Sequence, residues 1–278
     1  MKDLPDIKDI GDPPDIEEIL AKYRQEKKSR PNRVVTGRLR TVVIILQTII
    51  YGVTRYWLWA ANLFALFILG LGILAPFSMA NGQVERAQSA YNFLATQNHQ
   101  RPERSYFLFS DAGGIQTYSI EQLETFGVDP AHSQSFIGTP ELGYKMGLNH
   151  RMTAIFIAIL LAGLAWPWMG YRPQLSWIWF LFFLLPLVFD GLAHGISESS
   201  TDPFRETNAW AVALTGGLFS NTFYTGTTYG TLNWLLRTVT GFWFGLGLVW
   251  FLYAYLLNRF APVRNKLAPK LRKIGVVR

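Results

Sequence analysis

Four long apolar runs dominate the pattern of hydrophobic and polar positions along the chain. They cover residues 56–79, 152–169, 174–195 and 232–257. Runs of about 18 or more apolar residues are long enough to cross a bilayer as helices. Another apolar run, residues 41–53, is too short for a span, so we interpret it as an interfacial helix or as a lead-in to the first span. The pattern predicts an all-α integral membrane protein with about four transmembrane helices.

The connections between these spans differ in length. About seventy residues separate the first two spans and about thirty-six separate the last two, whereas a tight turn at 170–173 joins the middle pair. We therefore expect a disordered or amphipathic N-terminal segment at 1–40, a four-helix membrane domain at 41–257 and a basic tail at 258–278. Residues 1–33 are polar, so we expect no cleavable signal peptide.

Basic residues are concentrated near the two ends of the chain. Ten of the 26 Lys and Arg lie in residues 1–40, and seven more lie in residues 259–278. Cytoplasmic flanks of membrane proteins are rich in Lys and Arg, which anionic headgroups attract. We therefore expect a cell-membrane protein with both termini in the cytoplasm and a long extracytoplasmic loop between spans 1 and 2. The expected partners are membrane lipids and either a larger membrane complex or a homo-oligomer, and no nucleic acid.

Ionisable side chains interrupt the third and fourth spans. Asp190 and His194 are four residues apart and share one face of the third helix, and Arg237 lies near the start of the fourth. Charged groups within a span are costly, so these mark either a ligand site or a structural ion pair, and we predict a pair between Asp190 and Arg237. Small residues beside them predict close helix packing. These residues are Gly191 and Gly195 in the third span and Gly241 and Gly245 in the fourth.

The first long connection carries a second polar cluster. Its members are His99, Gln100, Arg101, Glu103 and Arg104, with His150 and Arg151 at the start of the second span. Arginine matches phosphate with two parallel hydrogen bonds, so this density of basic groups predicts an anion or phosphate headgroup site. The alternative is a wet interfacial loop whose arginines extend to headgroups. We expect residues 99–109 to fold back against the span ends, because SYFLF is too apolar to remain exposed.

The chain carries no motif of an enzyme or of a cofactor site. It has no cysteine, which excludes disulfides, thiolate catalysis and thiolate metal ligands. Phosphate-binding-loop, dinucleotide-binding and nucleophile-elbow patterns are missing. A zinc or iron site is an alternative that no paired ligand spacing supports. Its ligands would be His99, His150, His194 and Asp190. We predict no metal, no cofactor and no catalytic residue.

Five segments of the chain form a recognisable set. They are HQRPERSYFLF at 99–109, TPELGYK at 139–145, NHRM at 149–152, FDGLAHG at 189–195 and LLRTVTGFWFGLG at 235–247. In these segments, over roughly residues 90–255, the chain resembles a prokaryotic family of predicted membrane proteins, domain-of-unknown-function family 2085. The family usually has two cysteines where Asn98 and Asn149 stand here, so whatever that pair does is not done with sulfur in this chain. The resemblance implies a topology and no activity.

Two hypotheses about function follow. The first is a non-enzymatic accessory or assembly subunit of a membrane complex, whose polar cluster fixes its fold, a partner or a lipid headgroup. The second is a membrane enzyme or transporter that acts on a lipid headgroup or another anionic ligand at that cluster. The missing enzyme motifs favour the first hypothesis, which we predict. The cost of placing charge inside a membrane favours the second.

Overall fold

The computed structural model describes residues 36–96, 100–169 and 174–277, together with Glu17, Ala21 and Gln25. Two compact units, Met1–Ile49 and Ile50–Arg278, make up the chain. His99, Asn98, the turn at 170–173 and most of the N-terminal segment at 1–40 lie outside the described residues.

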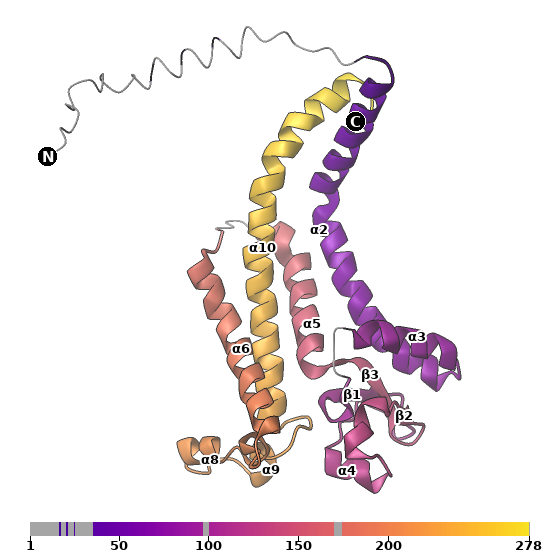
Figure 1. The fold of residues 1–278 in the computed structure, drawn as a ribbon, viewed down its shortest axis with the longest axis vertical. Helices are drawn as coiled ribbons and strands as arrows, with labels where there is room; N and C mark the ends of the chain where they lie inside the picture. The colour runs from indigo at the N-terminus through magenta and orange to yellow at the C-terminus, as the bar shows by residue number, and fades with distance from the viewer. Residues whose placement is uncertain are drawn as a thin grey trace, which may run out of the picture. The chain divides into compact units, whose positions relative to one another are not determined.

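Within the described residues, four helices are long and apolar enough to cross a membrane, as the sequence predicts. They are α2 (Gly37–Ala80), α5 (His150–Ala165), α6 (Trp177–Ser199) and α10 (Leu232–Lys273), and a 3₁₀ turn, η4 (Trp166–Trp168), prolongs α5 (Figure 1). The predicted class, a helical multi-pass membrane protein, is confirmed at this level.

Two of the long helices extend beyond the predicted spans. Residues 41–53 belong to α2 itself rather than to a separate helix. Helix α10 runs past residue 257 to Lys273, although Pro262 and Pro269 lie within it, so most of the predicted basic tail is helical. Basic side chains in its last turn favour this end, because the helix dipole places negative charge there.

Helix α10 packs against α5 through its glycines (Figure 1). A Cβ atom added at Gly241 would lie 2.7 Å from the carbonyl oxygen of Arg151, and one added at Gly245 would lie 2.6 Å from that of Ile155. Backbone atoms cannot move aside as a flexible side chain can, so these two positions need glycine for the helices to approach.

The glycines of α10 and those of α6 differ in what lies next to them. The row on α10 faces α5, and on α6 an added Cβ at Gly195 would have open space around it. A Cβ added at Gly191 would lie 3.4 Å from the Nη1 atom of Arg151, at the end of a flexible side chain. Aromatic rings join α6 to α10 instead. The pair Phe183–Trp243 stacks with ring centroids 4.7 Å apart.

The connection between α2 and α5 folds into a small α+β subdomain, which the all-α prediction missed. Its elements are α3 (Val84–Ala95), η2 (Pro102–Arg104), β1 (Ser105–Leu108), α4 (Ile120–Thr125), η3 (Pro130–Ser135), β2 (Gly138–Thr139) and β3 (Gly143–Asn149). The three strands form an antiparallel sheet in the order β1-β3-β2.

Strand β3 fixes this subdomain to the spans. Met146 and Leu148 are buried in one cluster with Ile68 of α2, Leu94 of α3 and Phe156 of α5. The strand leads directly into α5, because its last residue, Asn149, caps that helix by accepting a 2.9 Å hydrogen bond from the backbone N–H of Met152.

The connection between α6 and α10 contains three short helices, α7 (Phe204–Thr207), α8 (Ala209–Thr215) and α9 (Asn221–Tyr224). Two buried asparagines hold it together. Asn208 donates from Nδ2 to the carbonyl oxygens of Arg205 and Tyr224, at 3.0 and 2.6 Å. Asn233, in the first turn of α10, donates to the carbonyl oxygen of Arg205 at 2.7 Å. Arg205 is therefore fixed from both sides at the ends of α6 and α10.

Candidate functional site

Asp190 on α6 binds two arginines, and Arg237 is not one of them. Its Oδ2 atom lies 2.5 Å from Nη2 of Arg151, at the start of α5, and its Oδ1 atom lies 2.7 Å from Nη2 of Arg205, on α7. Asp190 and Arg205 are each 6% exposed, so these are buried charges. The predicted Asp190–Arg237 pair is wrong. Arg151 and Arg205 occupy the two oxygens of this carboxylate.

Arg237 is directed at a histidine instead. Its Nη2 atom contacts Nε2 of His194, one helical turn beyond Asp190 on α6. A guanidinium only donates, so Nε2 of His194 accepts and carries no proton. The Nη1 atom of Arg237 and the Nδ1 atom of His194 are buried without a hydrogen-bond partner among the described residues.

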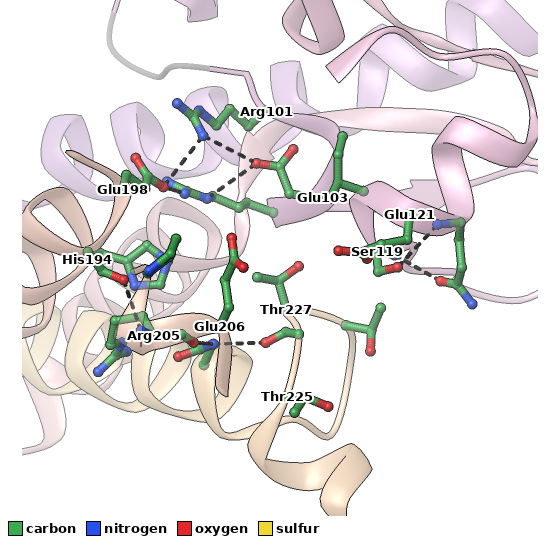
Figure 2. Close-up of a pocket in the computed structure, with 18 of the residues that line it drawn as sticks. Arg101, Glu103, Ser119, Glu121, His194, Glu198, Arg205, Glu206, Thr225 and Thr227 are labelled. Carbon is green, nitrogen blue, oxygen red and sulfur yellow. Dashed lines mark hydrogen bonds and ion pairs between the residues drawn. The ribbon is translucent and has the colours of Figure 1, made fainter. Parts of the chain in front are cut away.

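A second ion-pair group joins the 3₁₀ turn η2 to the last turn of α6 (Figure 2). Arg104 contacts Glu198, and Arg101 lies 3.5 Å from the same carboxylate. Glu103, which is buried, lies 3.7 Å from Arg101 and 3.5 Å from Nε of Arg104. Two arginines and two glutamates therefore balance one another here.

Arg205, His194 and the ion-pair group of η2 and Glu198 border a cavity of about 590 Å³. His194, Glu198 and Arg205 lie along one side of it, and Ser119 and Glu121 at the N-terminal turn of α4 lie across from them (Figure 2), and Arg104 also lines it. Residues 225–228, which precede α10, line its floor. The Nε atom of Arg205 is buried without a hydrogen-bond partner in the described part of the chain.

Buried positive charge exceeds buried negative charge around this cavity. Asp190 neutralises only one of its two arginines, and Arg237 faces a neutral imidazole. The group of Asp190 with its two arginines and the pair of Arg237 with His194 therefore each keep one net positive charge. Glu121 and Glu206 also line the cavity, but both are exposed, so water and salt screen them. The interior of the site is therefore cationic, and its rim carries the acids.

Arg104 keeps its charge at neutral pH. Burial lowers its pKa from 12.5 to about 10, and Glu103 opposes the shift. Lys145 on β3 is also buried, and burial lowers its pKa to about 8. Its Nζ atom donates to the carbonyl oxygens of Gln100 and Gln134, at 2.9 and 2.6 Å. This lysine therefore links the start of the segment 99–109 to the sheet.

Most of the residues singled out in the sequence converge on this region. Arg101, Glu103, Arg104, Arg151, Asp190, His194 and Arg237 belong to the contacts above. Gln100 points away from the cavity, since its Nε2 atom donates to the carbonyl oxygen of Tyr91 at 2.9 Å. His150 is buried against the ring of Tyr106, with centroids 4.4 Å apart. His99 lies outside the described residues.

The predicted return of residues 99–109 to the span ends is seen in the described part of that segment. Arg101 and Arg104 reach Glu198 on α6, and the hydroxyl of Tyr106 accepts a 2.9 Å hydrogen bond from Nε1 of Trp234 on α10.

Sequence inspection missed Glu198 and Arg205. Glu198 continues the row of Asp190 and His194 by one more i,i+4 step, so extending the helix beyond the apolar run would have found it. Arg205 carries no such signal, because it lies in an irregular connection. No three His, Asp or Glu side chains gather closely enough to hold a metal ion within residues 36–96, 100–169 and 174–277.

No family model matches the chain, and neither a curated protein nor a solved structure matches it.

Proposed function

We propose that this membrane protein binds a phosphate-class anion, either free or as a lipid headgroup, in the cavity between η2, α4 and the ends of α6 and α10. The observation that carries the proposal is the sharing of Asp190 between Arg151 and Arg205, of which Arg205 lines the cavity. Uncompensated buried charge is costly, and an anion in the cavity would supply the missing countercharge.

The donors suit a phosphate group. Arg205 has its Nε–H unused, and Arg104 and Arg101 line the same cavity with planar guanidinium groups. Such groups bind phosphate oxygens in pairs, with geometry that a lysine does not offer. The threonines and backbone of residues 225–228 add neutral donors on the floor.

Binding is tested with the full chain in nanodiscs of zwitterionic lipid. Inorganic phosphate is titrated by calorimetry, and phospholipids retained from the native membrane are identified by native mass spectrometry. We expect Arg205→Gln to abolish the response and Arg86→Gln to leave it unchanged, because Arg86 is exposed and outside the cavity. A calorimetric response identifies a free anion, and retained anionic lipid identifies a headgroup. Neither response in the wild type would overturn the proposal.

We also propose that both termini are cytoplasmic and that the cavity faces the extracytoplasmic side of the cell membrane. The basic end of α10 supports this orientation, because Lys270, Arg272 and Lys273 occupy its last turn. The connections at the opposite ends of the spans then share the other side of the membrane.

The resemblance to family 2085 remains part of the proposal. Four of the five quoted segments supply charged side chains to one cluster. Arg101 and Arg104 come from the first, Arg151 from NHRM, Asp190 and His194 from FDGLAHG, and Arg237 from the last. Segments that are far apart in the chain and meet at one place are what a shared ligand site requires.

A non-enzymatic accessory subunit is the second candidate function. The apolar window of α6 is only 22% buried within the chain, so a large helical face is free for another subunit or for lipid. Purification from native membranes separates the two candidates. Stoichiometric recovery of a larger complex, without bound phosphate or anionic lipid, would favour the subunit.

A further inference from the structure

The connection between α6 and α10 has the surface of a lipid-facing segment. Residues 207–236 contain no Asp, Glu, Lys, Arg or His. Leu214 and Leu218 are 80% and 77% exposed, and Tyr229 is 70% exposed. Trp210 and Phe219 are about half exposed in the same stretch. A solvated loop would place polar side chains at these positions.

Polar groups of this connection are satisfied internally. The Asn208 amide is fully buried and donates to two carbonyl oxygens. Thr215 donates to the carbonyl oxygen of Ala211 at 2.8 Å and also contacts the hydroxyl of Tyr224. The best-buried polar groups of the connection, at Asn208 and Tyr224, are therefore paired inside the protein, while its large apolar side chains are exposed, as is typical of chain held at a membrane surface.

The apolar surface continues from a membrane span. Leu192 and Ile196, in the last turns of α6, are 57% and 62% exposed, and α7 and α8 follow directly after that helix (Figure 1). The connection also joins the ends of two spans, so it lies where the hydrocarbon core meets the headgroups. Trp and Tyr, the residue types that favour this depth, are both exposed on it.

We propose that residues 209–229 lie in the interface of the bilayer that α6 and α10 cross, with Leu214 and Leu218 inserted among the lipids. The segment anchors the mouth of the cavity to the membrane, because Thr222 and residues 225–228 line the cavity and belong to the same connection. The proposal rests on the exposed side chains and stands whether or not the cavity binds an anion.

The connection between α2 and α5 provides a matched control for a test of this proposal by nitroxide labelling. It carries charged residues throughout, yet Ile115 on it is 68% exposed, which is close to the exposure of Leu214. A nitroxide label at residue 115 should therefore report water, although the residue it replaces is equally apolar and equally exposed.

The chain has no native cysteine, so single labels are readily placed. Leu214→Cys, Leu218→Cys and Ile115→Cys are each labelled with a nitroxide in nanodiscs that hold one copy of the full chain. Relaxation is then measured with oxygen, which partitions into lipid, and with a water-soluble nickel chelate. Because all three side chains lie on the surface, the substitutions remove few internal contacts, and circular dichroism checks that the fold is kept.

We expect the ratio of oxygen to nickel accessibility to be several-fold higher at residues 214 and 218 than at residue 115. Nickel accessibility at 214 and 218 equal to that at 115 would overturn the proposal. Protection of 214 and 218 from both reagents would also overturn it, since it would show that protein rather than lipid covers the segment.

Discussion

Arg205 binds Asp190 from fifteen residues further along the chain, with Nη2 2.7 Å from Oδ1 and both side chains buried. This contact joins a short helix in a membrane-surface connection to the interior of a span. Because Arg151 holds the other carboxylate oxygen, Asp190 links α5, α6 and the connection in one place. Its loss would release all three.

A double-mutant cycle on Asp190 tests this arrangement. Asp190→Asn leaves two arginines unpaired, so we expect a loss of roughly 3–5 kcal/mol in the free energy of unfolding. Adding Arg205→Gln should recover more of that loss than adding Arg237→Gln, because Arg205 binds Asp190 directly and Arg237 contacts His194. Thermal unfolding in detergent is measured for the wild type, the three single variants and the two double variants. Greater recovery with Arg237→Gln would contradict the observed pairing.

The glycines of α10 and α6 should respond differently to the same substitution. Gly241→Ala places a Cβ against the backbone of α5, and overpacking of this kind costs about 1–3 kcal/mol. Gly195→Ala meets open space on α6 and should be neutral or slightly stabilising, since alanine favours helix. The difference in unfolding temperature between these two variants is the measurement. Equal destabilisation would show that the α10–α5 contact is looser than described.

Lys145 should make the protein more stable as the pH rises. Burial lowers the pKa of its ammonium group from 10.5 to about 8 in the folded state. Between these two values the unfolded chain binds the proton more tightly, so the free energy of unfolding increases with pH, by on the order of 3 kcal/mol in total. The gain is absent below pH 8 and complete above pH 10.5. Lys145→Met should remove this part of the pH dependence.

The comparison of wild type and Lys145→Met at each pH cancels the titration of other groups. Lys266→Met serves as a control, because Lys266 is exposed and its charge is solvated in both states. Identical pH profiles for wild type and Lys145→Met between pH 8 and 10.5 would show that the buried ammonium is not destabilised.

The spans were predictable because membrane insertion depends on length and composition, which a sequence displays directly. Helices 152–169 and 232–257 were located on that basis. The α+β subdomain was not, since β3 pairs with β1 across some forty residues, and its apolar positions serve the packing of α2 and α5 as well as the sheet. Such non-local pairing leaves no periodic signal in one sequence.

The sequence predicted most of the residues that form the site but not which of them form ion pairs with one another. The free-energy cost of placing ionisable groups inside a membrane span marked Asp190, His194 and Arg237 as important, and all three are buried at one place. Which arginine binds Asp190 depends on how α5 and α7 approach α6, and that depends on backbone contacts such as the one at Gly241. Arg205 could not be identified from the sequence, because hydrogen bonds with residues in other segments, among them Ser197, Asn208 and Asn233, hold it in place.

The proposed orientation is tested by labelling from one side. Asn221→Cys and Asn265→Cys introduce single exposed thiols, the first in the connection between α6 and α10 and the second in the basic extension of α10. In intact cells we expect an impermeant maleimide to label residue 221 and not residue 265, because basic flanks stay in the cytoplasm. The same labelling in permeabilised cells controls for the reactivity of each thiol with the maleimide. Labelling of residue 265 in intact cells would reverse the topology.

Glu198 forms ion pairs with two arginines that would otherwise be available to bind an anion. Its carboxylate contacts Arg104 and lies 3.5 Å from Arg101 at the edge of the cavity. Glu198→Gln keeps the size of the side chain but removes its charge, so Glu103 remains as the one carboxylate beside the two guanidinium groups, which are then more available to a ligand. If the cavity binds a phosphate-class anion, this variant should bind inorganic phosphate or anionic lipid several-fold more tightly, up to about tenfold, which corresponds to 1.4 kcal/mol. Glu85→Gln, an exposed substitution on α3 outside the cavity, should leave the affinity unchanged. Arg104→Gln should weaken binding, and the opposite signs at residues 198 and 104 distinguish a ligand site from a purely structural ion pair. A structural pair would make both substitutions destabilising and neither one a gain in affinity.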